Sequence, residues 1–269
     1  MNHLHNIVDQ FQVTGIVQEI APLGAGLIND TYKVITEDIT TPDYVLQKIN
    51  HAIFQDVDLM QNNIKRVTDH IRQKLRERGE SDLDRKTLKI IPAKDGKLYF
   101  FDGTSYWRMT LLIADCKSFE QVTPEFSYYT GKAFGDFQNM LVDLPGEPLG
   151  ATIPNFHNME FRLEQFHEAI EANKAGRLEK AQVIVDELLS RAEEMCKAER
   201  MNREGILPKR ITHCDTKVNN MLFDKEGNFL CVIDLDTTMP GYVLSDFGDF
   251  IRTAGNTAAE DETDLSKIG

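Results

Sequence analysis

The sequence predicts a mixed α+β protein made of two unlike parts. Residues 1–115 hold several β-branched and aromatic runs separated by turn residues, together with one long amphipathic stretch. Residues 116–269 are dominated by helical periodicity and carry a single β-hairpin pattern late in the chain. The 269 residues are enough to bury the core of one large domain or two modest ones. We therefore expect an antiparallel sheet with one long helix, followed by a mainly helical part.

The strands of the first part follow from short apolar runs between turn signals. Residues 31–36 and 44–49 flank a Thr-Thr-Pro-Asp turn, which predicts a hairpin. Residues 88–91, 98–101 and 106–113 predict three more strands, because Asp-Gly pairs at 95–96 and 102–103 are strong hairpin signals. Between the two groups, apolar residues recur every three or four positions from Val57 to Leu75, and this predicts a helix that Gly79 ends.

The second part begins with a helix start at Thr123, which is followed by a proline in the first helical position. Pro145 and Gly146 end that helix, a second begins near Met159, and an apolar stripe over residues 181–195 predicts a third. Residues 221–223 and 229–233, separated by a Lys-Glu-Gly-Asn turn, predict a hairpin.

Charge and composition exclude several classes of protein. The chain has 30 basic and 43 acidic residues, a net charge of −13, which argues against binding nucleic acid or an anionic membrane. No apolar run is long enough for a membrane helix, and the N-terminus lacks the features of a secretory signal. The four cysteines form no CxxC pair and no zinc spacing, so we expect reduced thiols in a cytoplasmic protein.

The most informative pattern surrounds one aspartate near residue 215. His213 precedes Asp215 by two residues, Asn220 follows it by five, and Asp234 ends an apolar strand fourteen residues further on. Phosphoryl transfer needs such groups, because one carboxylate accepts the proton of the acceptor hydroxyl while a carboxylate and an amide oxygen hold Mg²⁺. Asp236 is open to two interpretations: a ligand of a second metal, or a cap of the following turn.

HxDxxxxN followed by a strand that ends in Asp resembles the aminoglycoside phosphotransferase and choline kinase superfamily of small-molecule kinases. The resemblance implies a protein-kinase-like two-lobed fold, with a nucleotide-binding N-lobe over residues 1–115 and a catalytic helical C-lobe over residues 116–269. It implies ATP and Mg²⁺ as cofactors, Asp215 as catalytic base and His213 as the brace of its loop. Asn220 and Asp234 would be the metal ligands.

Residues 211–264 look most like the N-acetylhexosamine 1-kinases, which implies an amino sugar as the small-molecule substrate, phosphorylated at its anomeric hydroxyl. Another acceptor, such as an aminoglycoside or choline, is the alternative, and a catalytically silent nucleotide-binding relative is a second. A glycosidase has no support, because nothing places a partner carboxylate across a sugar ring. Members of the superfamily continue with further helices, so the resemblance also implies that the C-terminal ones are missing here.

The resemblance places nucleotide binding in the first part. Gly24, Gly26 and Asn29 lie in a loop between predicted strands, where glycines let backbone amides approach a phosphate. Lys48 lies in the next strand, where the kinase fold carries its phosphate-binding lysine. Strand alternation puts Val45, Gln47 and Ile49 on one face and Lys48 on the other, and the sequence does not say which face meets the nucleotide. The helix over residues 57–75 lacks the glutamate that usually pairs with this lysine.

Two further segments carry expectations by analogy. Residues 108–113 are the candidate for the segment that joins the two parts and contacts the adenine. Residues 246–248 spell Asp-Phe-Gly, which we expect to be a structural turn and not the metal site, because the triplet follows Asp234.

Overall fold

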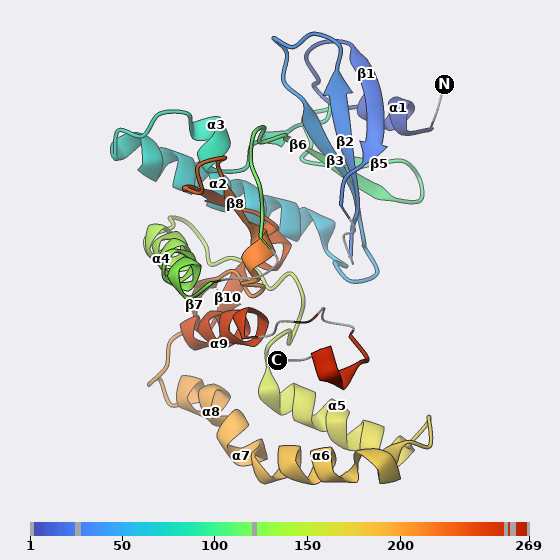
Figure 1. Ribbon diagram of the computed structural model, residues 1–269, viewed down its shortest axis with the longest axis vertical. Helices are drawn as coiled ribbons and strands as arrows, with labels where there is room; N and C mark the ends of the chain where they lie inside the picture. The colour runs from blue at the N-terminus through green and yellow to red at the C-terminus, as the bar shows by residue number, and fades with distance from the viewer. Residues whose placement is uncertain (1–2, 25–27, 120–122, 256–257, 259–261, 268–269) are drawn as a thin grey trace.

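The computed structural model describes residues 3–24, 28–119, 123–255, 258 and 262–267. An antiparallel sheet lies at one end of the molecule and helices α5 to α8 at the other, with α2, α4 and α9 between them (Figure 1). The predicted α+β class, with a sheet and one long helix followed by a mainly helical region, is confirmed. Among the described residues, no helix is both long and apolar enough to cross a membrane.

The sheet has six strands in the order β1-β2-β3-β6-β4, with β5 beside β6, and all its described pairs are antiparallel. One face is closed by α1 (His3–Val8), a short helix that the sequence analysis did not predict. Ile7 and Val8 of that helix pack in one apolar cluster with Leu46, Trp107 and Met109 of the sheet. The strands are β1 (Val17–Pro22), β2 (Asp30–Thr36), β3 (Tyr44–Ile49), β4 (Ile90–Ile91), β5 (Phe100–Phe101) and β6 (Tyr106–Leu111).

The turn between β5 and β6 is organised by Asp102. Its carboxylate accepts hydrogen bonds from Trp107 Nε1 at 2.8 Å and from the backbone N–H groups of Thr104 and Ser105, both at 2.8 Å. Burial of the Asp102 carboxyl acts to raise its pKa, but these hydrogen bonds outweigh burial and hold the pKa well below its usual range. Asp102 and Gly103, which the sequence predicts to form a turn, therefore lie in a turn that these hydrogen bonds stabilise.

The opposite face of the sheet packs on α2 (Val57–Glu77), as the apolar periodicity predicts. Asp56 caps the helix, its Oδ1 accepting from the N–H of Leu59 at 2.9 Å, and Gly79 at φ +75° follows its end. Val57 and the other apolar residues of α2 share one cluster with Ile49 of the sheet and Phe137 of α4. The long helix therefore joins the sheet to the helical region through one continuous core.

The first two predicted helices of the second part are confirmed. Thr123 Oγ1 accepts from the N–H of Phe126 at 3.3 Å and so caps α4, with Pro124 in the first turn. The third predicted helix is interrupted, since α6 ends at Ser190 and two short helices follow. Val185 is the only residue of its apolar stripe that is buried, so little packing holds a longer helix together. The remaining helices are α3 (Leu83–Lys86), α4 (Pro124–Met140), α5 (Met159–Ala172), α6 (Leu178–Ser190), α7 (Ala192–Met195), α8 (Lys197–Arg203) and α9 (Val243–Ala254).

Two small antiparallel pairs frame the segment that contains Asp215. The predicted hairpin is formed by β8 (Met221–Phe223) and β9 (Phe229–Val232), while β7 (Arg210–Thr212) pairs with β10 (Met239–Gly241). Short 3-10 turns, η1 (Val218–Asn220) and η2 (Leu235–Thr237), follow Asp215 and Asp234, and a third, η3 (Leu265–Lys267), lies near the end of the chain. The chain passes from the sheet to the helical region between Leu111 and Pro124, the interval that contains the proposed boundary at residue 115.

Candidate active site

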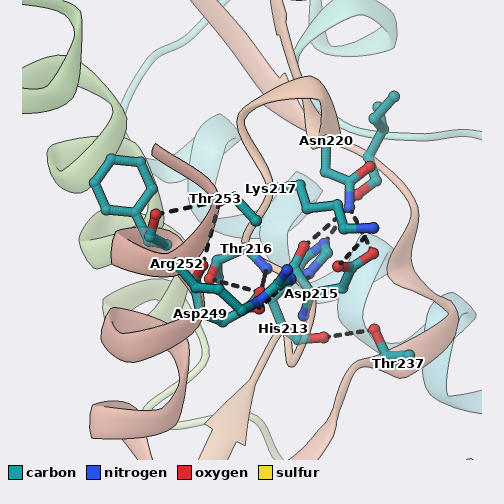
Figure 2. Close-up of polar contacts among 11 residues, drawn as sticks. His213, Asp215, Thr216, Lys217, Asn220, Thr237, Asp249, Arg252 and Thr253 are labelled. Carbon is teal, nitrogen blue, oxygen red and sulfur yellow. Dashed lines mark hydrogen bonds and ion pairs between the residues drawn. The ribbon is translucent and has the colours of Figure 1, made fainter. Parts of the chain in front are cut away.

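The segment between β7 and β8 brings Asp215 and Asn220 into direct contact. Asn220 Nδ2 donates to Asp215 Oδ2 at 3.1 Å and to the Asp215 carbonyl oxygen at 2.9 Å (Figure 2). Lys217 Nζ lies 3.8 Å from Asp215 Oδ1. The Asp215 side chain is 26% exposed, so its carboxylate is oriented by these neighbours and still accessible to a substrate.

His213, in the same segment between β7 and β8, is completely buried. Its Nε2 lies 2.9 Å from the Ile233 carbonyl oxygen, and its Nδ1 lies 3.3 Å from the Asp215 N–H, which donates to it. Because a carbonyl can only accept and an amide can only donate, the two contacts assign the ring hydrogen to Nε2. Its own carbonyl oxygen accepts from Thr237 Oγ1 at 2.8 Å. These contacts are those of a loop brace, the role predicted for His213.

Two carboxylates of α9, which were not among the site residues predicted from the sequence, accept hydrogen bonds from the backbone of the loop that carries Asp215. Asp246 is 3% exposed, and its two oxygens accept from the N–H groups of His213 at 3.0 Å and Cys214 at 2.9 Å. Asp249 Oδ2 accepts from the Thr216 N–H at 2.7 Å. The Asp-Phe-Gly triplet therefore lies inside a helix and not in the expected turn. The sequence contains a signal for this arrangement, because Asp246 and Asp249 are three residues apart and such residues lie on the same face of a helix.

The β8–β9 hairpin brings Asp234 next to Asn220. The N–H of Ile233 donates to the Asn220 carbonyl oxygen at 2.8 Å, and Asp234 follows with φ +56°, in the left-handed region. The Asp234 residue is exposed to solvent, but many protein atoms surround its carboxyl group. The resulting desolvation, together with the negative charge of Asp236, raises the pKa of this carboxyl to about 6. Turn and hairpin together bring the backbone of Asp234 close to that of Asn220, and the charge of Asp215 adds to the rise in the pKa of Asp234.

The donor chemistry of this pair fits Mg²⁺. A carboxylate from Asp234 and the Oδ1 oxygen of Asn220 are hard oxygen ligands, and Mg²⁺ is usually bound by one or two protein groups, with water and phosphate completing the shell. Asn220 Nδ2 is engaged by Asp215, which leaves Oδ1 as its remaining side-chain acceptor. Within the part of the chain that the structure describes, no three His, Cys, Asp or Glu side chains form a metal-binding group.

Asp236 matches neither interpretation left open by the sequence. It is 2% exposed, and its carboxylate forms a two-pronged ion pair with Arg108 of β6, in which Arg108 Nη2 lies 3.0 Å from Oδ2. Asn29 Nδ2 donates to the same Oδ2 atom at 2.8 Å. The structure also corrects the expectation that residues 108–113 join the two parts. Residues 108–111 lie inside β6, whose two edges pair with β3 and with β4 and β5, so the connection between the two parts follows Leu111.

Among the described residues, no hydrogen bond or ion pair joins Lys48 to Asp215, Asn220 or Asp234. Lys48 pairs across the sheet with Trp107, on the face covered by α1, and its Nζ lies 3.8 Å from Asp30 Oδ2. Gln47, the neighbour of Lys48 in β3, lies on the opposite face, where it bonds to Arg108. The role predicted for Lys48 therefore finds no support in this placement, and the register of β3 is the physical reason.

The glycine-containing loop is described only in part. Gly24 has φ +72°, as a residue in a tight turn does, whereas Gly26 lies outside the described residues. Asn29 is 8% exposed, and its side chain bonds to protein groups, as above. On α2, the two acidic residues at its start have other partners: Asp56 caps the helix and Asp58 accepts from Tyr99 OH at 3.0 Å.

A cavity of about 300 Å³ lies beside the loop that carries Asp215, between residues 151–158 and β10. Asn155, Phe156, His157 and Asn158 line one side, and Cys214, the neighbour of Asp215, is also part of its wall. The rings of Phe156 and His157 stack with centroids 4.5 Å apart. Aromatic faces next to amide groups offer both stacking and hydrogen bonds to a small polar ligand.

Comparisons with known proteins concern the family and the fold of the chain. The model of the phosphotransferase enzyme family matches residues 114–265. An aminoglycoside phosphotransferase from Alicyclobacillus acidocaldarius is 13% identical and has a TM-score of 0.58, over 93% of this chain and 70% of that chain. An amicoumacin kinase, solved with AMP-PNP, Ca²⁺ and Ami, is 12% identical with a TM-score of 0.59, over 94% of this chain and 69% of that chain.

A choline kinase from Streptococcus pneumoniae is 16% identical with a TM-score of 0.53, over all of this chain and 81% of that chain. At such identities these structures show a shared fold, that of small-molecule kinases. The family match spans more than half of the chain and includes Asp215, Asn220 and Asp234. The chain belongs to the phosphotransferase enzyme family.

Proposed function

We propose that this protein transfers the γ-phosphoryl group of ATP, bound with Mg²⁺, to a hydroxyl group of a small molecule. The observation that carries the proposal is the convergence of Asp215, Asn220 and Asp234, which the β8–β9 hairpin and the Asn220 hydrogen bonds join in one site. The amicoumacin kinase that shares the fold was solved with the ATP analogue AMP-PNP, which supports ATP as the donor.

In this proposal Asp215 accepts the proton of the acceptor hydroxyl as its oxygen bonds to the γ-phosphorus. The bond between that phosphorus and the bridging oxygen breaks, and ADP leaves. Asn220 holds the Asp215 carboxylate in position, and His213 fixes the backbone beneath it. Asp234 and Asn220 would hold Mg²⁺, which neutralises charge on the phosphates when it is bound. Most of the catalytic effect then comes from positioning and charge neutralisation.

We propose the cavity beside the catalytic loop as the acceptor site. Its volume of about 300 Å³ suits a single sugar ring or an amino alcohol, and the stacked Phe156 and His157 pair provides a flat face for a ring. Asn155 is suited to a hydroxyl or acetamido group, and Asn158, whose Oδ1 caps α5, donates from Nδ2 to Asn155 Oδ1 and holds it in place. Together with the sequence resemblance over residues 211–264, this favours the anomeric hydroxyl of an N-acetylhexosamine.

The test is a panel of acceptors incubated with ATP and Mg²⁺: N-acetylglucosamine, N-acetylgalactosamine, choline and an aminoglycoside. Phosphorus NMR of the product distinguishes a phosphate on the anomeric oxygen from one at any other position. We expect ADP formation to depend on an N-acetylhexosamine, and Phe156→Ala to raise the KM for that sugar without changing the KM for ATP. Transfer to choline or the aminoglycoside alone would contradict the sugar specificity, and ATP binding without any transfer would contradict catalysis.

A further inference from the structure

A buried polar bridge connects the N-terminal sheet to the turn that carries Asp234. Its centre is the ion pair of Arg108 with Asp236, whose side chains are 7% and 3% exposed. Both carboxylate oxygens of Asp236 face the guanidinium group, one on Nη1 and one at 3.0 Å from Nη2. Such a two-pronged pair fixes the angle as well as the distance between its partners. We call Asn29, Gln47, Arg108 and Asp236 the Asp236 bridge.

The sheet side of the bridge is anchored in three neighbouring strands. Arg108 Nε donates to Gln47 Oε1 at 2.9 Å, and Gln47 Nε2 donates in turn to Thr31 Oγ1 at 3.1 Å. These residues lie on β6, β3 and β2, which are adjacent in the sheet. The Arg108 guanidinium group is therefore held on two sides, and a shift of the sheet is passed on to Asp236.

Asn29 attaches the end of the glycine-containing loop to the same carboxylate. Its Nδ2 donates to Asp236 Oδ2 at 2.8 Å, and its Oδ1 accepts from the N–H of Asn50 at 3.0 Å. Both polar atoms of the Asn29 side chain are thus bonded inside the protein. This arrangement suits a residue that anchors the loop better than one that contacts a phosphate.

Asp236 lies two residues after Asp234, within η2. The next residue, Thr237, donates to the His213 carbonyl oxygen at 2.8 Å, and the Thr238 carbonyl oxygen accepts from Asn63 Nδ2 of α2 at 3.2 Å. One short turn therefore contacts the sheet through Asp236, the catalytic loop through Thr237 and the long helix through Thr238.

We infer that Asp236, Arg108 and Asn29 are positioning residues, which hold Asp234 and the glycine-containing loop in a fixed relation, and that Asp236 is not a ligand of a second metal. The catalytic meaning of this inference rests on the proposed function, whereas the bridge itself is a property of the fold. Arg108 of β6 therefore serves as a binding partner of Asp236 inside the protein.

The chemistry of a buried ion pair gives this inference a distinctive signature. Removal of one partner leaves the other charge buried and unpaired, which costs more than the removal of both. Arg108→Gln and Asp236→Asn should therefore each lower the unfolding temperature, while the double variant should lower it no further than the worse single one. A matched control is the pair of Arg72 and Asp84, which is more exposed and lies away from Asp234.

The experiment compares Arg108→Gln, Asp236→Asn, their double variant and the control pair Arg72→Gln and Asp84→Asn. Its readouts are the unfolding temperature, kcat, the KM for ATP, the Mg²⁺ concentration for half-maximal rate and hydrogen exchange at the Asn50 amide. We expect each bridge variant to lose about 10- to 100-fold in kcat, the range found for groups that orient metal ligands. The double variant should lose no more, and Asn29→Ala should speed exchange at Asn50.

Several outcomes would overturn the inference. A weakened response to Mg²⁺ in Asp236→Asn but not in Arg108→Gln would make Asp236 a metal ligand. A raised KM for ATP in Arg108→Gln alone would make Arg108 a phosphate contact, and additive losses of unfolding temperature would show that the two residues act separately. If the wild-type protein transfers no phosphate, the proposed function fails, but the unfolding temperatures and the Asn50 exchange still decide whether the bridge exists.

Discussion

The replacement Asp246→Asn tests how the catalytic loop is held. The Asp246 carboxylate accepts three hydrogen bonds, from the N–H groups of His213 and Cys214 and from Gln138 Nε2 at 2.7 Å. An asparagine side chain offers one acceptor oxygen and one NH₂ group, so at least one of the two buried backbone N–H groups loses its partner. An unsatisfied buried donor costs about 1–3 kcal/mol, and the remaining bonds lose their ionic character. We therefore expect a loss of about 2–4 kcal/mol in the free energy of unfolding.

Urea denaturation measures this loss, with Asp69→Asn as the matched control. Asp69 is 61% exposed on α2, and its one ion pair among the described residues is with Lys65, one helical turn away, so its replacement should cost less than about 0.5 kcal/mol. Because the loop that carries Asp215 starts at these two amides, kcat should fall as well, while the KM for ATP stays close to the wild-type value. A stability within 0.5 kcal/mol of wild type would refute the reasoning, since it would mean that the two amides find other partners.

Three further predictions concern other parts of the structure. A Cβ atom at Gly241 would collide with Thr212 Oγ1, so Gly241→Ala should lose about 1–3 kcal/mol in urea denaturation, whereas Gly248→Ala, with open space in α9, should gain about 0.5–1 kcal/mol. Because the pKa of Asp102 is lowered in the folded protein, its ionised carboxylate stabilises the fold above about pH 4, and this stabilisation is lost on acidification. The difference in free energy of unfolding between wild type and Asp102→Asn should therefore become smaller below about pH 4. Asn220→Ala should lower kcat at least about 100-fold and weaken the response to Mg²⁺ in steady-state assays.

Each of these three has an outcome that contradicts it. Equal stabilities for the two alanine variants would show that β10 can move away from β7. A pH-independent gap for Asp102→Asn would mean that its carboxyl has the same pKa in the folded and unfolded chains. An unchanged Mg²⁺ response in Asn220→Ala would remove this residue from the metal site.

The elements that the sequence predicts well are those whose pattern repeats over many residues. The apolar period from Val57 onward predicts α2 because a long buried stripe is specific for a helix. The spacing of Asp215, Asn220 and Asp234 predicts one site because a short hairpin must bring its two ends together. Local signals such as Thr123 and the Asp-Gly turn at residues 102–103 are confirmed, because capping and turn geometry depend on neighbouring residues only. The hairpin expected around residues 95–96 is not formed, since β4 and β5 each pair with β6.

Other features depend on contacts between distant residues. The placement of Lys48 depends on which face of β3 meets the site, and a strand pattern fixes the alternation of side chains but not the partner of each face. The ion pair of Arg108 with Asp236 joins residues 128 positions apart. The pairing of β7 with β10 rests on three residues in each strand, too few to give a recognisable pattern.

The most direct test of the account is the rate of phosphoryl transfer by Asp215→Asn under saturating ATP and acceptor, measured beside the affinity of the same variant for ATP with Mg²⁺. Asparagine keeps the size of the side chain and a hydrogen-bonding oxygen but cannot take up the proton. The account predicts a kcat lower by about 10²- to 10⁴-fold with nucleotide affinity within twofold of wild type. Transfer at a rate within threefold of wild type would contradict it, because another group would then be the base.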